Sequence, residues 1–217
     1  MKKALTSLAL TSALNLSVFA QNSLTNTFNG KLEIRGPECI GCATYDIAAA
    51  YKVRINVEIL PIFNHYEADM TVTNATLAQM LEAVMNINTN YVLRYETQTD
   101  SYYINPKTNA VSLMKCDQVS ITNKPLFELF GEDGVPAFNE IGLGCSVHRA
   151  NFYVFEVDVS LDVEDMFVWQ ILDALEAQIP NLKGWGIQEI RPEEVSKEGY
   201  RYMVEFNQTR STGLNPD

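Results

Sequence analysis

The chain uses one hydrophobic pattern twice. Residues 68–84 (ADMTVTNATLAQMLEAV) and 159–175 (VSLDVEDMFVWQILDAL) each run from a short alternating stretch into apolar residues at helical spacing. An acid, Glu82 or Asp173, occupies the same place in both copies. The matching apolar pairs are Val72 with Val163, Leu77 with Val168, Met80 with Ile171, Leu81 with Leu172, Ala83 with Ala174 and Val84 with Leu175. The pattern predicts two copies of one strand–helix unit, with the shared positions on the buried face of the helix.

The first half of the chain alternates between strand and helix patterns. Alternation of apolar and polar residues predicts strands, and apolar residues three or four apart predict helices. Asn88-Thr89-Asn90 ends the second helix, and Thr73 or Asn74 is the expected cap at its start. The expected elements are a strand at 31–35, a helix at 38–51, strands at 53–59 and 70–72, a helix to about 87, and a hairpin of 91–96 with 102–104.

The second half repeats this order with an interruption. The segment GEDG separates two helical turns, expected at 125–130 and 135–141. Strands are expected at 119–121, 145–154 and 157–161, then a helix to about 178 that Asp162, Glu164 or Asp165 caps, and a hairpin of 185–190 with 200–206. We therefore expect an α+β fold of two tandem β-α-β-β-α-β-β repeats, each with two helices on a small, mainly antiparallel sheet.

The N-terminal segment is typical of a secretory signal peptide. Lys2 and Lys3 precede an apolar stretch, and Val18-Phe19-Ala20 places small residues where a signal peptidase cleaves. The expected organisation is a signal peptide at 1–20, a lead-in at 21–30, a first domain at 31–107, a linker at 108–116, a second domain at 117–207 and a tail at 208–217. We expect the mature protein to be periplasmic, without stable membrane insertion.

The charge of the chain limits its partners. The formal net charge is −11, and removal of Lys2 and Lys3 with the signal peptide brings it to −11 − 2 = −13. Nucleic acids and anionic membranes require clustered Lys and Arg. We therefore expect no nucleic-acid partner, and we interpret the dispersed acids as a solvated surface.

The four cysteines are candidates for disulfide chemistry. Cys39 and Cys42 form a C-x-x-C at the start of a predicted helix, a place where a thiol pKa can fall and give a redox dithiol. A structural disulfide is the alternative, because exported proteins keep such bonds. The expected second bridge, between Cys116 and Cys145, would close a loop of roughly 30 residues, worth about 3–4 kcal/mol. Three connectivities are possible, and the sequence does not choose among them.

Other chemical motifs favour no catalytic site. His65 and His148 stand apart, and neither a G-x-S-x-G nor an H-E-x-x-H segment occurs. Ala43 stands where haem attachment requires histidine, and zinc would require a second close cysteine pair. We therefore expect no catalytic residue, metal or cofactor. Strand tyrosines leave open an aromatic ligand platform, and the junction between the halves leaves open a small-molecule site.

A family resemblance rests on the first copy of the pattern. A strand followed by V-x-N-x-T-L-x-x-x-L-x-x-V and a hairpin resembles the secretin and TonB short N-terminal (STN) domain, and is similar to the N0/N1 modules of secretins. The residues that carry it are Val72, Asn74, Thr76, Leu77, Leu81 and Val84, then Tyr91, Leu93 and Tyr103-Ile104. The likeness covers 31–107, and 117–207 keeps the order but departs at GEDGVP. The resemblance implies a non-catalytic periplasmic module that docks to an envelope protein, such as an outer-membrane channel or a secretion component.

Aromatic residues distinguish the second copy. Phe167 and Trp169 lie on a different helical face from Val168 and Leu172, and Trp185 follows in the next predicted strand. Such a helix is either buried between the two halves or exposes a patch for a partner. Phe167, Trp169 and Trp185 are therefore the partner-binding candidates, and a redox role for Cys39 and Cys42 is the alternative function.

Overall fold

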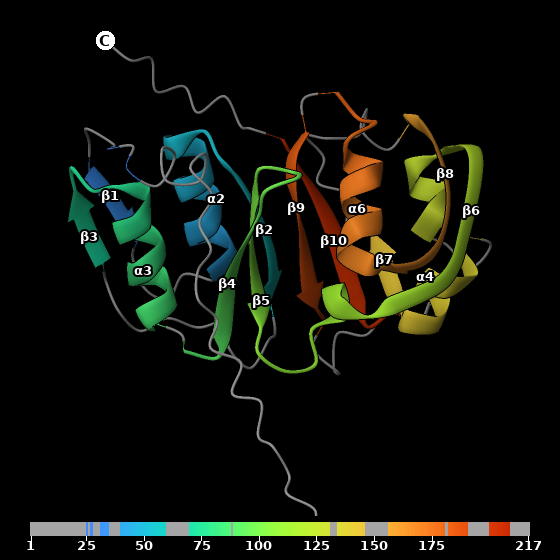
Figure 1. Cartoon of the computed structure of the whole chain (residues 1–217), viewed down its shortest axis with the longest axis horizontal. Helices are drawn as coiled ribbons and strands as arrows, with labels where there is room; N and C mark the ends of the chain where they lie inside the picture. Colours follow the sequence, from blue (N-terminus) through green and yellow to red (C-terminus); the bar gives the residue numbers. More distant parts are fainter. Residues whose placement is uncertain are drawn as a thin grey trace, which may run out of the picture.

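A six-stranded sheet runs through the middle of the molecule (Figure 1). The computed structural model describes Thr25, Thr27 and residues 31–34, 40–59, 70–87, 89–130, 134–145, 156–180, 182–190 and 200–208. In spatial order the sheet contains β4 (Tyr91–Glu96), β5 (Ser101–Pro106), β2 (Arg54–Ile59), β9 (Leu182–Glu189), β10 (Tyr202–Gln208) and β7 (Leu143–Cys145). Both halves of the chain therefore contribute to one sheet.

Two short sheets and several helices flank the central one. The two-stranded sheets are β1 (Lys31–Ile34) with β3 (Met70–Thr73), and β6 (Lys115–Pro125) with β8 (Asp158–Phe167). The helices are α2 (Ile40–Tyr51), α3 (Leu77–Ile87), α4 (Pro136–Ile141) and α6 (Val168–Glu176), with 3₁₀ turns η2 (Val111–Leu113) and η3 (Leu126–Phe130). The fold is mixed α+β with a mainly sheet core. None of the helices in the described part of the chain is long and apolar enough to span a membrane.

Strand β2 joins the two halves. It pairs in parallel with β5 on one side and with β9 on the other. Gly184, at φ +122°, lies where an added Cβ would come within 3.0 Å of the Ile55 carbonyl oxygen. At Gly186 an added Cβ would lie 2.8 Å from the Tyr45 hydroxyl. Glycine therefore lets β9 approach β2 and α2 closely at this junction.

The helices of the two halves pack on opposite faces of the sheet. Ile55, Val57 and Ile59 of β2 belong to a core that includes residues of α2 and α3. Asn56, the intervening residue, hydrogen-bonds Asp173 of α6. Successive side chains of a strand point to opposite faces, so α2 and α3 cover one face and α6 covers the other. Figure 1 shows these groups on the two sides of the sheet.

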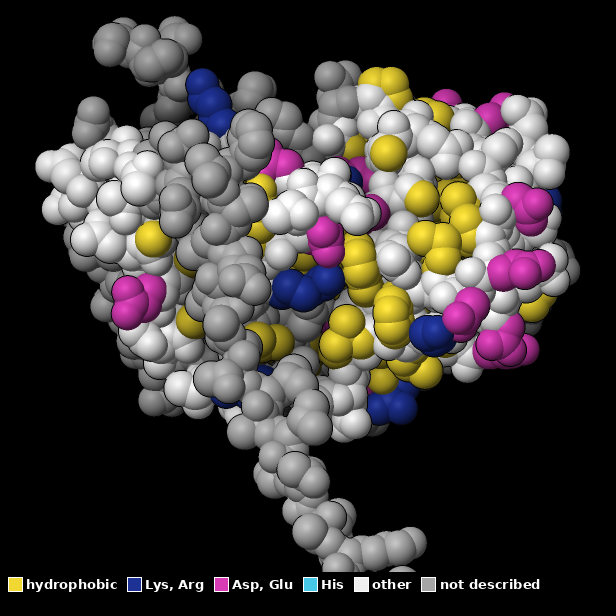
Figure 2. Space-filling view, viewed as in Figure 1, with side chains coloured by type: hydrophobic (Ala, Val, Ile, Leu, Met, Phe, Trp, Pro, Cys, Tyr) yellow, Lys and Arg dark blue, Asp and Glu magenta, His cyan; other side chains and the backbone are white. Residues whose placement is uncertain are grey.

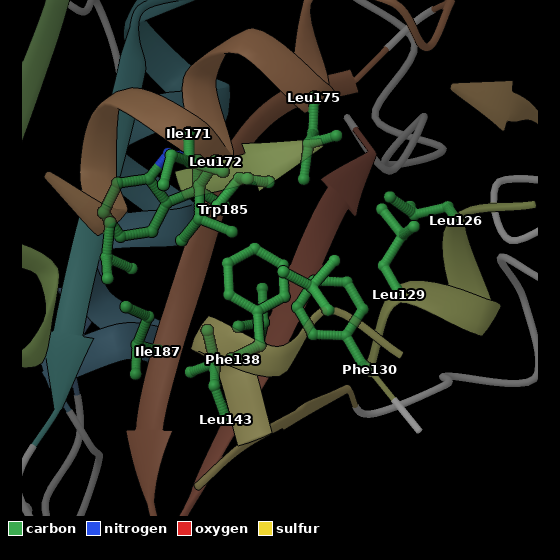
Figure 3. Packing of buried hydrophobic residues seen from close by; sticks show 14 of the residues in the cluster. Leu126, Leu129, Phe130, Phe138, Leu143, Ile171, Leu172, Leu175, Trp185 and Ile187 are labelled. Carbon is green, nitrogen blue, oxygen red and sulfur yellow. The ribbon is translucent and has the colours of Figure 1, made fainter. Parts of the chain in front are cut away.

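The repeated helical positions are buried as predicted. In α3 the buried positions are Leu77, Met80, Leu81 and Val84, and in α6 they are Val168, Ile171, Leu172 and Leu175. Each such side chain stabilises the fold by roughly 1.5–3 kcal/mol through the hydrophobic effect, before the loss of conformational entropy. Figure 3 shows the α6 side chains packed with Phe138, Leu143 and Trp185 in the larger core. Phe130 and Phe138 stack there with ring centroids 5.1 Å apart.

Several predicted boundaries were wrong. The α6 helix begins at Val168, not at 162–165, because residues 158–167 continue β8 and pair with β6. Gln170 Oε1 accepts the Phe167 N–H at its start, at 3.0 Å. Thr76, not Thr73 or Asn74, caps α3, since Thr76 Oγ1 accepts the Gln79 N–H at 3.3 Å and Gln79 Oε1 accepts the Thr76 N–H at 2.8 Å.

The expected linker and some expected strands also differ. Residues 108–116 contain η2 and the first residues of β6, and Val111 and Ser112 are buried. The strand expected at 145–154 is described only as β7, since 146–155 lie outside the described residues. The first predicted helical turn of the second half is the 3₁₀ turn η3.

Candidate interaction site

One face of β2 carries three polar residues that meet the second half of the chain or the segment that precedes it. Arg54, Asn56 and Glu58 alternate with the apolar residues of the strand. Asn56 is fully buried and Glu58 is 1% exposed. Buried polar groups need hydrogen-bond partners, so their contacts define how the halves fit together.

Asp173 is the centre of a buried network at this junction. Its Oδ2 accepts a short hydrogen bond from the Tyr103 hydroxyl of β5, and its Oδ1 accepts one from Trp185 Nε1 of β9 at 2.7 Å. Asn56 Nδ2 donates to Asp173 Oδ1 at 3.4 Å, while Asn56 Oδ1 accepts the Trp185 backbone N–H at 3.0 Å. We call these four residues, Asn56, Tyr103, Asp173 and Trp185, the junction network. Glu82, at the corresponding place in α3, is exposed.

Two further buried carboxylates lie on either side of the network. Glu176 of α6 forms an ion pair with Arg54 and accepts the Gly184 N–H at 2.7 Å. Glu58 accepts three hydrogen bonds: from the Val111 N–H at 2.6 Å, from the Ser112 N–H at 3.0 Å and from the Ser112 hydroxyl at 2.6 Å. The segment expected to be a linker is therefore fixed to β2.

Burial shifts the titration of these acids. Desolvation raises the pKa of Glu58, Asp173 and Glu176 above the ordinary values, although the hydrogen bonds that each accepts oppose the shift. Desolvation, together with the hydrogen bond to Asp173, also raises the pKa of Tyr103, which remains a hydroxyl donor. The junction therefore favours protonated carboxyl groups more than water does.

Above the junction network, Arg94 of β4 lies against two aromatic rings. Its Cζ is 4.4 Å from the Tyr103 ring centroid and 4.3 Å from the Trp169 ring centroid. The two rings meet edge to face at 5.3 Å. Cation–π attraction to both rings holds the guanidinium against the corner that they form. Trp169 is therefore half-buried by Arg94 and Tyr103 instead of projecting freely from α6.

Further apolar side chains lie on β4, η2, β8 and α6, the elements near this stack. Val92, Leu113 and Met114 are 44–46% exposed, and Phe167 and Trp169 are half-buried. Contacts link these elements: the Val168 N–H donates to the Met114 carbonyl oxygen at 2.9 Å. Lys115 pairs with Phe167 in the β6–β8 ladder, and its Nζ lies 5.5 Å from that ring. We call Val92, Arg94, Leu113, Met114, Phe167 and Trp169 the β4–α6 patch. Figure 2 shows hydrophobic side chains gathered on this face, with Lys and Arg side chains among them.

The structure separates the predicted partner-binding residues. Phe167 and Trp169 lie in the β4–α6 patch. Trp185 does not, because its side chain is fully buried and its indole N–H is bonded to Asp173, so its assignment to a partner-binding surface was wrong. The sequence left two interpretations of the aromatic helix: burial between the halves, or an exposed patch for a partner. The core face of α6 is buried, and Phe167 and Trp169 at its N-terminal end are partly exposed.

The predicted Cys116–Cys145 bridge is not formed. Cys116 is a buried thiol in β6, and Cys145 Sγ in β7 donates to the Val204 carbonyl oxygen at 3.3 Å. Cys116 lies in the two-stranded β6–β8 sheet, and Cys145 lies in the six-stranded sheet. Cys39 lies outside the described residues, as do His65 and His148, and of Cys42 the structure describes the backbone in α2.

Sequence reasoning missed Arg94, Leu113 and Met114. Arg94 looked like an ordinary polar residue of an alternating strand, and Leu113 and Met114 fell in the expected linker. The run VSLM within a polar region was the available signal for an ordered, exposed apolar turn. Comparison with protein-family models, with curated proteins and with solved structures finds no match for this chain.

Proposed function

We propose that this chain is an exported, non-catalytic interaction module of the bacterial envelope that binds another envelope protein through the β4–α6 patch. The observation that carries the proposal is the patch itself, which combines five exposed or half-buried apolar side chains from β4, η2, β8 and α6 and the segments next to them with an arginine packed on Trp169. Exposed apolar side chains grouped on one face are typical of a protein–protein interface. Aromatic residues and arginine are also the types that dominate binding energy.

The architecture that we propose is a tandem pair of STN-like units. The strand pairings support it, because each pairing in the first half has an equivalent in the second. The antiparallel pair β1–β3 corresponds to β6–β8, the parallel pair β2–β5 to β7–β10, and the antiparallel pair β4–β5 to β9–β10. In this reading β2 and β9 join the two units edge to edge.

The differences between the units support the choice of site. Trp185 in β9 follows Gly184 and is buried against β2, whereas Arg94 in β4 has no described strand beyond it. The equivalent edges thus differ: β9 pairs with β2, whereas β4, beside Trp169, pairs only with β5 in the described part of the chain. An outer-membrane channel or a secretion component is the kind of partner that the STN resemblance suggests.

Co-purification from the periplasm tests this proposal. Replacing both Leu113 and Met114 with Asp should abolish partner recovery, because buried charge is costly at an interface. Phe127→Asp is the matched control, since Phe127 is also apolar and 51% exposed but belongs to η3, outside the patch. Equal recovery with both variants, at wild-type stability, would contradict the proposal.

The runner-up function is thiol-disulfide exchange through Cys39 and Cys42. The observation that favours it is that Cys42 lies in the first turn of α2 as described, Ile40–Tyr51, where a thiol pKa can fall. Insulin reduction separates the two functions. If the wild type reduces insulin and Cys39→Ser does not, thiol-disulfide exchange would replace the interaction module as the proposed function.

A further inference from the structure

The outer edge of β4 is the most distinctive part of the patch. β4 is the first strand in the order of the six-stranded sheet, and its only pairing in the described structure is with β5. An edge strand presents backbone N–H and C=O groups to which an added strand can pair. Val92 and Arg94 are two residues apart in β4, so their side chains share one face of the sheet, the face on which α6 lies.

Arg94 at this edge retains its hydrogen-bonding capacity. Among the described residues its guanidinium donates no hydrogen bond, and it forms one long ion pair, with Glu96 Oε2 3.8 Å from Nη1. The Nη2 atom is buried without a partner. Contact with the Tyr103 and Trp169 rings leaves the donors at Nε and Nη1 for a carboxylate.

The other explanation for a charge on an edge strand is protection against aggregation. A protective side chain extends into water, where its charge repels an approaching strand. Arg94 instead packs against two rings, with its side chain 34% exposed. That arrangement fixes the position of the charge, which is what a binding site requires and what a protective charge does not.

We propose that β4 accepts an added strand from the partner, with a carboxylate opposite Arg94 and an apolar side chain two residues away, opposite Val92. This inference rests on the proposed function and specifies the partner of the same patch. An added strand would continue the alternation of β4, so residues two apart lie on the same face. The apolar side chain would contact Val92, and the carboxylate would bind Arg94.

Three synthetic peptides test the proposal. The probe is acetyl-Thr-Val-Thr-Asp-Thr-Val-Thr-amide, in which valine lies two residues from the acid in both directions, so either strand orientation satisfies the motif. The second peptide carries Asn in place of Asp. The third keeps Asp but has proline at both neighbouring positions, which removes backbone donors that a strand needs.

Amide chemical-shift perturbation measures the location and strength of binding. We expect the Asp peptide to shift the amides of β4 and to bind about tenfold or more tightly than the Asn and proline peptides. Arg94→Gln should remove this preference for Asp over Asn. Arg201→Gln is the matched control. Arg201 also lies over a tyrosine ring, with its Cζ 5.2 Å from the Tyr202 ring centroid. It is bonded to Glu189 of β9, however, and lies away from β4.

Several results would overturn the strand proposal. These are absence of binding by the Asp peptide, equal binding of the Asp and Asn peptides, equal binding of the proline peptide, or shifts that map away from β4. In each case the co-purification experiment still reports on the patch. If recovery still depends on Leu113 and Met114, the interaction module stands and only the form of its occupant is wrong.

Discussion

The burial of Asp173 can be tested against its exposed counterpart. Asp173→Ala removes the acceptor of the Trp185 indole N–H and of the Asn56 amide. The Tyr103 hydroxyl retains Thr99 as an alternative, with Thr99 Oγ1 at 3.1 Å. A buried donor that loses its partner costs about 1–3 kcal/mol, and the small cavity adds to this.

Relief of desolvation works in the opposite direction. The raised pKa of Asp173 indicates that burying its charge is unfavourable, so the substitution recovers part of what it loses. We therefore expect a net loss of about 2–4 kcal/mol in the free energy of unfolding. For a chain of this size that corresponds to a fall of roughly 4–16 °C in Tm.

Glu82→Ala is the matched control for this substitution. Glu82 holds the same place in α3 and is exposed, so its replacement should change stability by no more than about 0.5 kcal/mol. Urea unfolding followed by circular dichroism measures both variants. Equal effects of the two substitutions, or an effect of Asp173→Ala below about 0.5 kcal/mol, would refute the reasoning that the network stabilises the junction.

Three further predictions concern the junction and the thiols. Gly184→Ala should lower stability by more than about 1 kcal/mol in thermal unfolding, because its φ is +122° and the new Cβ would contact the Ile55 carbonyl; an unchanged Tm would contradict this. Since burial raises the folded-state pKa of Glu58, its contribution to stability is present below its unfolded pKa and is lost as pH rises through the folded pKa. The stability of wild type relative to Glu58→Gln should therefore decrease from about pH 4.5 to pH 7 in urea titrations, and the opposite trend would reject the assignment. A variant without Cys39 and Cys42 should show thiols at both Cys116 and Cys145 when unfolded without reductant, whereas an absence of reactive thiol would restore the bridge.

Local patterns predicted most elements because each depends on nearby residues. Alternation in Val53–Ile59 gave the strand β2, and the spacing of Leu77, Met80 and Leu81 gave the buried face of α3. The start of α6 was wrong because acids at 162–165 imitate a helix cap, while the alternation of Val159, Leu161 and Val163 continues a strand. Pairing with β6 decided between these signals, and that partner is distant in sequence.

The site depended on contacts that no local pattern specifies. Glu82 and Asp173 match in the sequence, yet only Asp173 faces Tyr103 and Trp185 of neighbouring strands. The parallel pairing of β2 with β9 brings these residues together, and its register depends on contacts across the whole chain. Trp185 was assigned to the surface for this reason, since its burial follows from β2 and α6 and not from its own segment.

Photocrosslinking in cells tests the central claim most directly. A benzophenone amino acid placed at Leu113 in the β4–α6 patch should give a discrete adduct with one envelope protein, because its side chain would contact the partner. The same amino acid at Phe127, which is equally exposed in η3, should give little or none. We predict that Trp169→Ala, in the protein that carries the benzophenone amino acid at position 113, reduces the yield of this adduct. Equal adducts from both positions, or no adduct from Leu113, would contradict the assignment of the patch as the partner-binding surface.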